Sequence, residues 1–149
     1  WEAGDRVCLH YLVFCGACDA CTGGREQFCP EGQMIGKSRD GGFAEYICVP
    51  ASSVHAIPAG IDLAEAAIMM CSTSTAFHAL KQARLQPGET VAVFGCGGLG
   101  YSAVQLAKTL GASRVFAVDI DEHKLAQVER LGAEAARPHR VTHRKLTRD

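Results

Sequence analysis

The sequence predicts a mixed α/β protein made of two unlike parts. The first third is rich in turns and short apolar runs, which favours β-strands and loops. The later part alternates apolar, strand-like runs with segments of helical spacing in the order strand, helix, strand, helix. This order is typical of a parallel sheet with right-handed crossovers. Between the two parts, residues 58–62 contain a proline and a glycine and mark a connection.

Short apolar runs are the strand candidates of the first part. They are residues 6–9, 11–14 and 43–49, and the last run alternates along the chain with a period of two, as a strand does. Asp62 is predicted to cap a helix that begins at Leu63, because its side chain can accept from the free N–H groups of the first turn.

The second part is expected to alternate strands and helices. In chain order we expect a helix over 75–85, a strand over 90–94, a helix over 102–110, a strand over 115–118 and a helix over 122–131. Gly111 and Gly132 follow the last two helices, where a left-handed C-cap is favoured. Residues 134–149 hold only scattered apolar side chains, so we expect no third strand and an irregular end. The predicted domains are residues 1–71 and 72–149.

Composition and charge exclude several classes of protein. The 15 Lys and Arg residues nearly balance the 16 Asp and Glu residues, so no overall field attracts nucleic acid or an anionic membrane. No apolar run approaches the roughly 20 residues that span a bilayer. Eight cysteines without a secretory signal indicate metal-binding or catalytic thiols in a reducing compartment, and we expect the cytoplasm. Because the chain starts at Trp1 and its predicted sheet is incomplete, we expect it to be part of a longer protein.

A group of cysteines with short gaps predicts a metal site in the first part. Cys15, Cys18, Cys21 and Cys29 form the pattern C-x2-C-x2-C-x7-C. Four thiolates can surround a tetrahedral zinc at about 2.3 Å and leave no open position, so the site is predicted to be structural. An iron–sulfur cluster and four unrelated buried cysteines are the alternatives. Arg25 is the one basic residue between Cys15 and Cys29, which disfavours a nucleic-acid-binding zinc module.

A glycine cluster after the first strand of the second part predicts a dinucleotide site. The pattern G-x-G-x-x-G is carried by Gly95, Gly97, Gly98, Leu99 and Gly100. Such a turn lets the backbone and the helix N-terminus approach a pyrophosphate. Asp119, at the end of the next strand, is expected to accept from a ribose 2′-OH and to repel a 2′-phosphate, which favours NAD over NADP. The alternatives are an ordinary strand-to-helix turn and, for Asp119, a helix N-cap.

Taken together, these segments resemble the zinc-dependent medium-chain alcohol dehydrogenases. The resemblance covers residues 1–133 and rests on residues 4–7, the four-cysteine loop, residues 40–46, Cys71 with Thr75, and residues 93–100. It implies a partial GroES-like catalytic domain up to Cys71, in which the four-cysteine loop holds structural zinc, and then a partial Rossmann domain. Taken alone, Cys71 would more often be a small buried side chain.

The resemblance also implies a function. Cys71 would be one ligand of a catalytic zinc, and Thr75 would lie near the nicotinamide. We expect hydride transfer between NAD and a small alcohol or carbonyl substrate in a longer parent protein that forms a homo-oligomer. The chain alone is expected to be inactive, because a catalytic zinc needs about three protein ligands. The alternative is a non-catalytic, zinc-stabilised dinucleotide-binding fragment.

Overall fold

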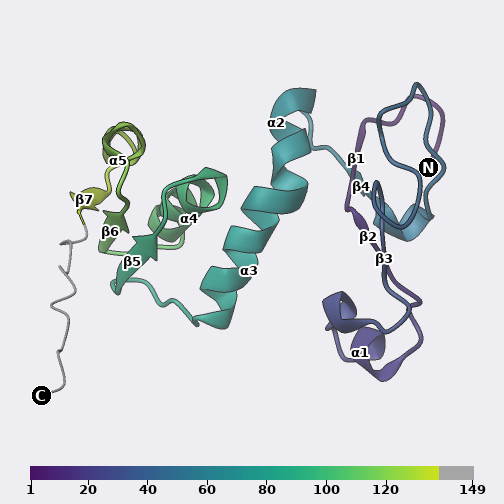
Figure 1. Cartoon of the computed structure of the whole chain (residues 1–149), viewed down its shortest axis with the longest axis horizontal. Coiled ribbons are helices and arrows are strands. Elements are labelled where there is room, and N and C mark those ends of the chain that lie inside the picture. The colour runs from purple at the N-terminus through teal and green to yellow at the C-terminus, as the bar shows by residue number, and fades with distance from the viewer. Residues whose placement is uncertain (138–149) are drawn as a thin grey trace, which may run out of the picture. The chain divides into compact units, whose positions relative to one another are not determined.

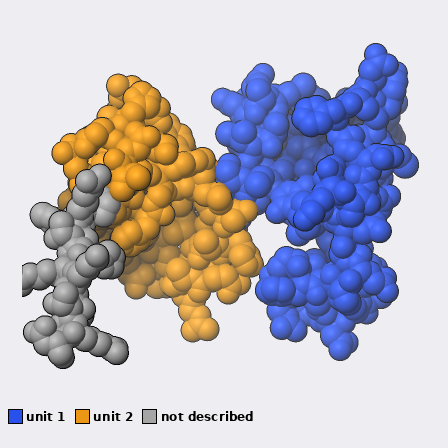
Figure 2. Space-filling view, viewed as in Figure 1, with its two compact units in different colours: residues 1–74 blue, residues 75–149 orange. Residues whose placement is uncertain are grey.

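The computed structural model describes residues 1–137 of the chain (Figure 1). The chain divides into two compact units, Trp1–Ser74 and Thr75–Asp149 (Figure 2). No helix in the part of the chain that the structure describes is long and apolar enough to cross a membrane.

The first unit contains two small antiparallel ladders. Strand β1 (Val7–Leu9) pairs with β4 (Val54–Ala56), and β2 (Leu12–Val13) pairs with β3 (Gln33–Met34). The predicted runs at the start of the chain therefore do form strands. The β2–β3 ladder brings together the two ends of the cysteine-bearing loop, which contains helix α1 (Asp19–Thr22) and a 3-10 turn over Glu26–Phe28.

The strand expected over residues 43–49 is absent from the described residues, and that prediction was wrong. No backbone hydrogen bond joins this run to another described segment. Phe43 and Tyr46 are 112% and 90% exposed, so their apolar rings pack on nothing in the described structure. Alternation alone does not make a strand, because a strand needs a partner for its backbone N–H and C=O groups.

A continuous helical stretch follows the connection. Asp62 caps α2 (Leu63–Ile68) as predicted, its Oδ1 accepting the Ala64 N–H at 2.8 Å. A π-helical turn over Met69–Thr73 leads into α3 (Ser74–Gln82). Helix α3 ends three residues before the predicted end, where the backbone turns ahead of Pro87.

The second unit is a three-stranded parallel sheet in which a helix connects each strand to the next along the chain (Figure 1). The sheet order is β5 (Thr90–Phe94), β6 (Arg114–Val118) and β7 (Glu134–Ala136), with α4 (Gly98–Thr109) and α5 (Glu122–Glu129) as the crossovers. Its core is fully buried and includes Val104, Ala107, Val115, Ala117 and Val128. The expected left-handed glycines follow α4 and α5, with φ of 91° at Gly111 and 83° at Gly132.

Strand β7 corrects the expectation that no strand follows residue 134. Its residues Glu-Ala-Ala have weak strand propensity, which is why the sequence did not reveal it. Pairing with β6 overrides that propensity, in a register that sets Phe116 opposite Glu134. The Glu134 carboxylate also accepts two hydrogen bonds from the Arg114 guanidinium, at 2.8 and 2.6 Å. Residues 138–149, the rest of the segment expected to be irregular, lie outside the described residues.

Candidate functional site

The cysteine sulfurs of the loop between β2 and β3 converge. Those of Cys15, Cys18, Cys21 and Cys29 all lie within 4.8 Å of one another. The Sγ atom of Cys15 is 3.9 Å from that of Cys21 and 3.7 Å from that of Cys29, and the Sγ atoms of Cys18 and Cys21 are 3.5 Å apart. A tetrahedral ion with bonds of about 2.3 Å needs sulfurs about 3.8 Å apart. The donor set therefore fits one zinc ion, and the alternative of four unrelated cysteines is wrong.

Local backbone geometry creates this group. Helix α1 sets Cys18 and Cys21 one turn apart, and Gly16 turns the chain with a φ of 76°. The N–H groups of Ala17 and Cys18 point at Cys15 Sγ, at 3.5 and 3.4 Å. These two bonds lower the pKa of Cys15 to about 7, whereas burial raises the pKa of Cys21 to about 12. Backbone N–H groups aimed at sulfur are what a negatively charged thiolate site requires.

The glycine turn joins β5 to α4. Gly95 has a φ of 89°, Gly97 is the N-cap of α4, and the helix starts at Gly98, earlier than the predicted residue 102. A Cβ at Gly100 would lie 1.8 Å from the Gly95 carbonyl oxygen, so helix and turn touch where only glycine fits. A Cβ at Gly95, Gly97 or Gly98 would meet nothing within 4 Å. The turn is therefore open beside these three glycines, and the first turn of a helix has N–H groups without an intrahelical acceptor, which suits an anionic pyrophosphate.

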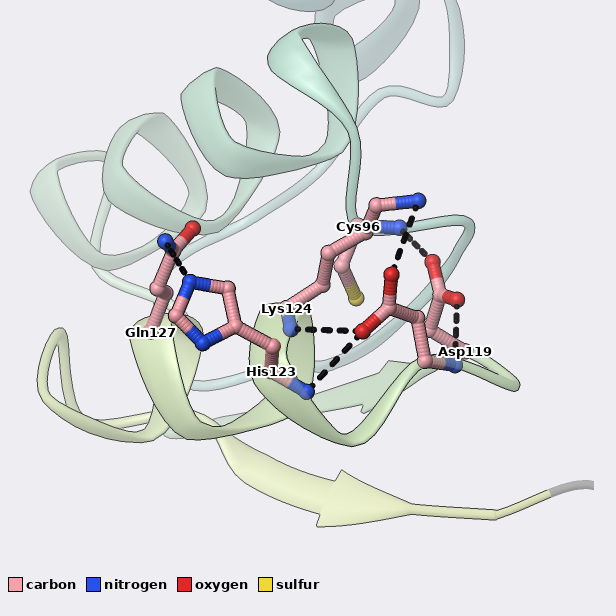
Figure 3. A network of polar contacts seen from close by, with 6 residues as sticks. Cys96, Asp119, His123, Lys124 and Gln127 are labelled. Atoms are coloured by element: carbon pink, nitrogen blue, oxygen red, sulfur yellow. Dashed lines mark hydrogen bonds and ion pairs between the residues drawn. The ribbon is translucent and has the colours of Figure 1, made fainter.

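Asp119 lies at the end of β6 and reaches back to this turn (Figure 3). Its Oδ2 accepts the N–H of Cys96 at 2.6 Å, and its Oδ1 accepts the N–H of Asp121 at 2.9 Å. The Cys96 bond, followed by the Asp121 bond, lowers the pKa of Asp119. The carboxylate is therefore charged, beside the turn and partly exposed, where it can meet a ribose hydroxyl.

The N-cap of α5 is Asp121, not Asp119, so the alternative reading of Asp119 as a cap is wrong. Asp121 Oδ1 accepts the N–H groups of His123 and Lys124, at 2.9 and 3.3 Å. Sequence reasoning missed this residue, although an Asp directly before an acidic first turn is a recognisable start signal.

Acid should weaken the second unit through three carboxylates. The folded pKa values of Asp119, Asp121 and Glu134 all lie below their ordinary values, because N–H or guanidinium donors stabilise the charged forms. Their contribution is present above about pH 4 and is lost as the pH falls through the lowered pKa values. Urea unfolding should therefore show lower stability near pH 3 than near pH 6. Asp121→Asn, which keeps a capping oxygen that cannot titrate, should flatten this dependence; equal stability at both pH values would contradict the assignment.

The remaining predicted site residues lie on the long helical stretch. Cys71 is exposed in the π-helical turn, and Thr75 follows in α3. Among the described residues, the four-cysteine group is the one set of three or more metal-ligand side chains whose ligand atoms converge. The structure thus brings together the four zinc-site cysteines, and separately the glycine turn with Asp119. Within residues 1–137, Cys71 is not part of any converging group of three or more metal-ligand side chains.

Both units match models of known families. Residues 1–59 match the alcohol dehydrogenase GroES-like domain, and residues 98–146 match the zinc-binding dehydrogenase domain. An alcohol dehydrogenase of Geobacillus stearothermophilus is 44% identical over 134 residues, which are 89% of this chain and 40% of that protein. The chain thus spans about 40% of the length of the curated relatives it matches.

Solved structures of alcohol dehydrogenases are similar to this chain as well. An NAD-dependent alcohol dehydrogenase superposes with a TM-score of 0.84 at 32% identity, over 92% of this chain and 40% of the other. The alcohol dehydrogenase of Aeropyrum pernix gives 0.82 at 40% identity, over 94% and 42%. The chain has a GroES-like part and a Rossmann-like part. The chain belongs to the zinc-dependent medium-chain alcohol dehydrogenase family.

Proposed function

We propose that this chain supplies the structural-zinc loop and the dinucleotide-binding turn of an enzyme that transfers hydride between an alcohol and NAD. The observation that carries the proposal is the presence, in one chain, of a converged four-thiolate group and an open glycine turn with a charged Asp119 beside it. When bound, NAD supplies the hydride acceptor, and a catalytic zinc supplies a Lewis acid that favours the alkoxide. Turnover of alcohols with NAD by the parent enzyme tests the proposal.

The glycine turn and Asp119 would select and orient the dinucleotide. The N–H groups at the start of α4 would donate to the pyrophosphate, which also favours the positive end of the helix dipole. Asp119 would accept from the ribose 2′-OH, because each of its oxygens retains a second lone pair after binding one N–H. Its negative charge would repel a 2′-phosphate, so NAD is favoured over NADP.

Replacing Asp119 by Ser should relax this choice. The variant should bind NAD more weakly, because a hydrogen bond to a charged group is worth about 1.5–3 kcal/mol. Its discrimination against NADP should shrink, since the repelling charge is gone. Titration of both dinucleotides against the parent and the variant measures the two dissociation constants. An unaltered protein that already prefers NADP would contradict the assignment.

Cys71 and Thr75 are proposed to belong to the catalytic centre. Cys71 would be one thiolate ligand of the catalytic zinc, and Thr75, one turn further along the helical stretch, would lie near the nicotinamide. Their support is the family membership and, for Cys71, its exposed position in a π-helical turn, a feature frequent at functional sites.

This chain alone should not oxidise alcohols. Among the described residues, Cys71 belongs to no group of three or more converging metal-ligand side chains, and a catalytic zinc needs about three protein ligands. Zinc-loaded chain should form no NADH from primary, secondary or polyol substrates. Zinc-dependent turnover that Cys71→Ala abolishes would contradict this expectation. A chain that binds zinc and NAD without turnover also fits the second candidate, a non-catalytic dinucleotide-binding fragment, and activity of the longer parent separates the two.

The state of the cysteines is the basis for a proposed cellular location. All eight are free, which fits a reducing compartment, and we therefore propose the cytoplasm. We further propose that the parent enzyme is a homo-oligomer that acts on a small alcohol or carbonyl compound. It is proposed to have no nucleic-acid or membrane partners. Fractionation of cells and sedimentation of the parent enzyme test these statements.

A further inference from the structure

The glycine turn is fastened to β6 at two points. The Gly95 N–H donates to the Val118 carbonyl at 2.8 Å, and the Cys96 N–H donates to Asp119 Oδ2 at 2.6 Å. The first contact continues the ladder between β5 and β6, while the second is made by a side chain (Figure 3). The Asp119 bond therefore extends the link between the strands past the end of the sheet.

The segment held in this way combines a buried cysteine side chain with two flexible glycines. Gly95 and Gly97 flank Cys96, and a Cβ at either glycine would meet nothing within 4 Å, so there is open space on the side of each Cα where a side chain would lie. Glycine also has more backbone freedom to lose than any other residue. Cys96 itself is 3% exposed. A buried N–H left without its acceptor is costly, so loss of the carboxylate should let this turn rearrange.

The carboxylate is in turn held by its other oxygen. Asp119 Oδ1 accepts the Asp121 N–H at 2.9 Å, and this bond fixes the side chain so that Oδ2 faces the turn. A carboxylate can accept from both N–H groups at once, whereas an amide side chain has one oxygen to offer. The arrangement thus needs an acid at this position for a reason that is independent of any ribose.

We propose that Asp119 is a positioning residue for the glycine turn, in addition to the ribose contact on which the proposed function relies. By holding the Cys96 N–H, it fixes the turn and so the direction of the N–H groups that would meet the pyrophosphate. Replacing Asp119 then weakens every dinucleotide, including one that offers this residue no hydroxyl.

The test compares two carboxylate deletions close in sequence, Asp119→Ala and Asp121→Ala. The second removes the cap of α5 but leaves the Cys96 bond intact, so it is the matched control. The probe is an NAD analogue whose adenosine carries no ribose hydroxyls, with NAD alongside. Amide hydrogen exchange at Cys96 is measured in the same proteins without any dinucleotide.

Asp119→Ala should raise the dissociation constant of the analogue by about tenfold and speed exchange at Cys96 by a similar factor. Asp121→Ala should change neither by more than about twofold, because it keeps both the Cys96 bond and the backbone N–H that holds Asp119 Oδ1. If Asp119→Ala does not fold, Asp119→Asn, with one accepting oxygen, should give smaller shifts in the same direction.

Unchanged analogue binding and unchanged Cys96 exchange in the Asp119 variants would overturn the positioning role. The proposed function fails in a different way, namely if the unaltered chain binds neither NAD nor the analogue. The exchange measurement still decides the role of Asp119 in that case, because it needs no dinucleotide.

Discussion

Replacing Cys21 by Ser should release zinc and unfold the loop between β2 and β3. Cys21 is the most buried of the four cysteines, at 8% exposure, and its sulfur contacts those of Cys15 and Cys18. A serine hydroxyl is a poor ligand for a site built for four thiolates. Cys21 is the one buried residue of residues 15–32, so the loop has no apolar core, and metal binding and local folding should be lost together. Elemental analysis should find about one zinc per unaltered chain and almost none in the variant.

The control for this experiment is Cys48→Ser, since Cys48 is an exposed cysteine of the same unit outside the converged group. It should retain the zinc. Removal of the metal by a chelator should reproduce the effect of Cys21→Ser on amide exchange within the loop. Visible charge-transfer absorption with stoichiometric iron and sulfide would show that the site holds an iron–sulfur cluster instead.

Gly100→Ala should disrupt the second unit more than any other single methyl group added to the glycine turn. The new Cβ would lie 1.8 Å from the Gly95 carbonyl oxygen and 2.9 Å from its carbon, and backbone atoms cannot move aside cheaply. Overpacking of this kind costs about 1–3 kcal/mol and occasionally more, and we expect the upper end. Urea unfolding measures the loss of stability. Because α4 would also be pushed from the turn, dinucleotide binding should fall below detection.

Gly98→Ala is the matched control, in the same helix two residues earlier. A Cβ there meets nothing within 4 Å, and the residue is already helical. Stability should be unchanged or should rise by up to about 1 kcal/mol, as alanine favours a helix over glycine. Equal losses in both variants would mean that the turn rejects any side chain, and that the contact with Gly95 is not the cause.

The zinc loop and the glycine turn could be predicted from the sequence because each is encoded locally. Cysteine spacing fixes which sulfurs can reach one ion, and glycine spacing fixes where a strand can turn into a close-packed helix. What could not be predicted depends on partners distant in the chain. Glu134 joins a strand because Arg114 and the β6 backbone lie beside it, and residues 43–49 form none because no described segment pairs with them. The hydrogen bond from Cys96 to Asp119 joins residues that follow two different strands, so neither segment alone predicts it.

The short β2–β3 ladder has a thermodynamic consequence for the metal site. It closes the base of the cysteine loop, with Leu12 paired to Met34 and Val13 to Gln33. Bringing the ends of a loop together costs entropy. Because the ladder already holds these ends together, less entropy is lost when the four cysteines bind an ion. By linkage, the ladder must strengthen zinc binding by the same factor by which zinc strengthens the ladder. The zinc affinity of this chain is therefore set in part by two residue pairs that never touch the metal.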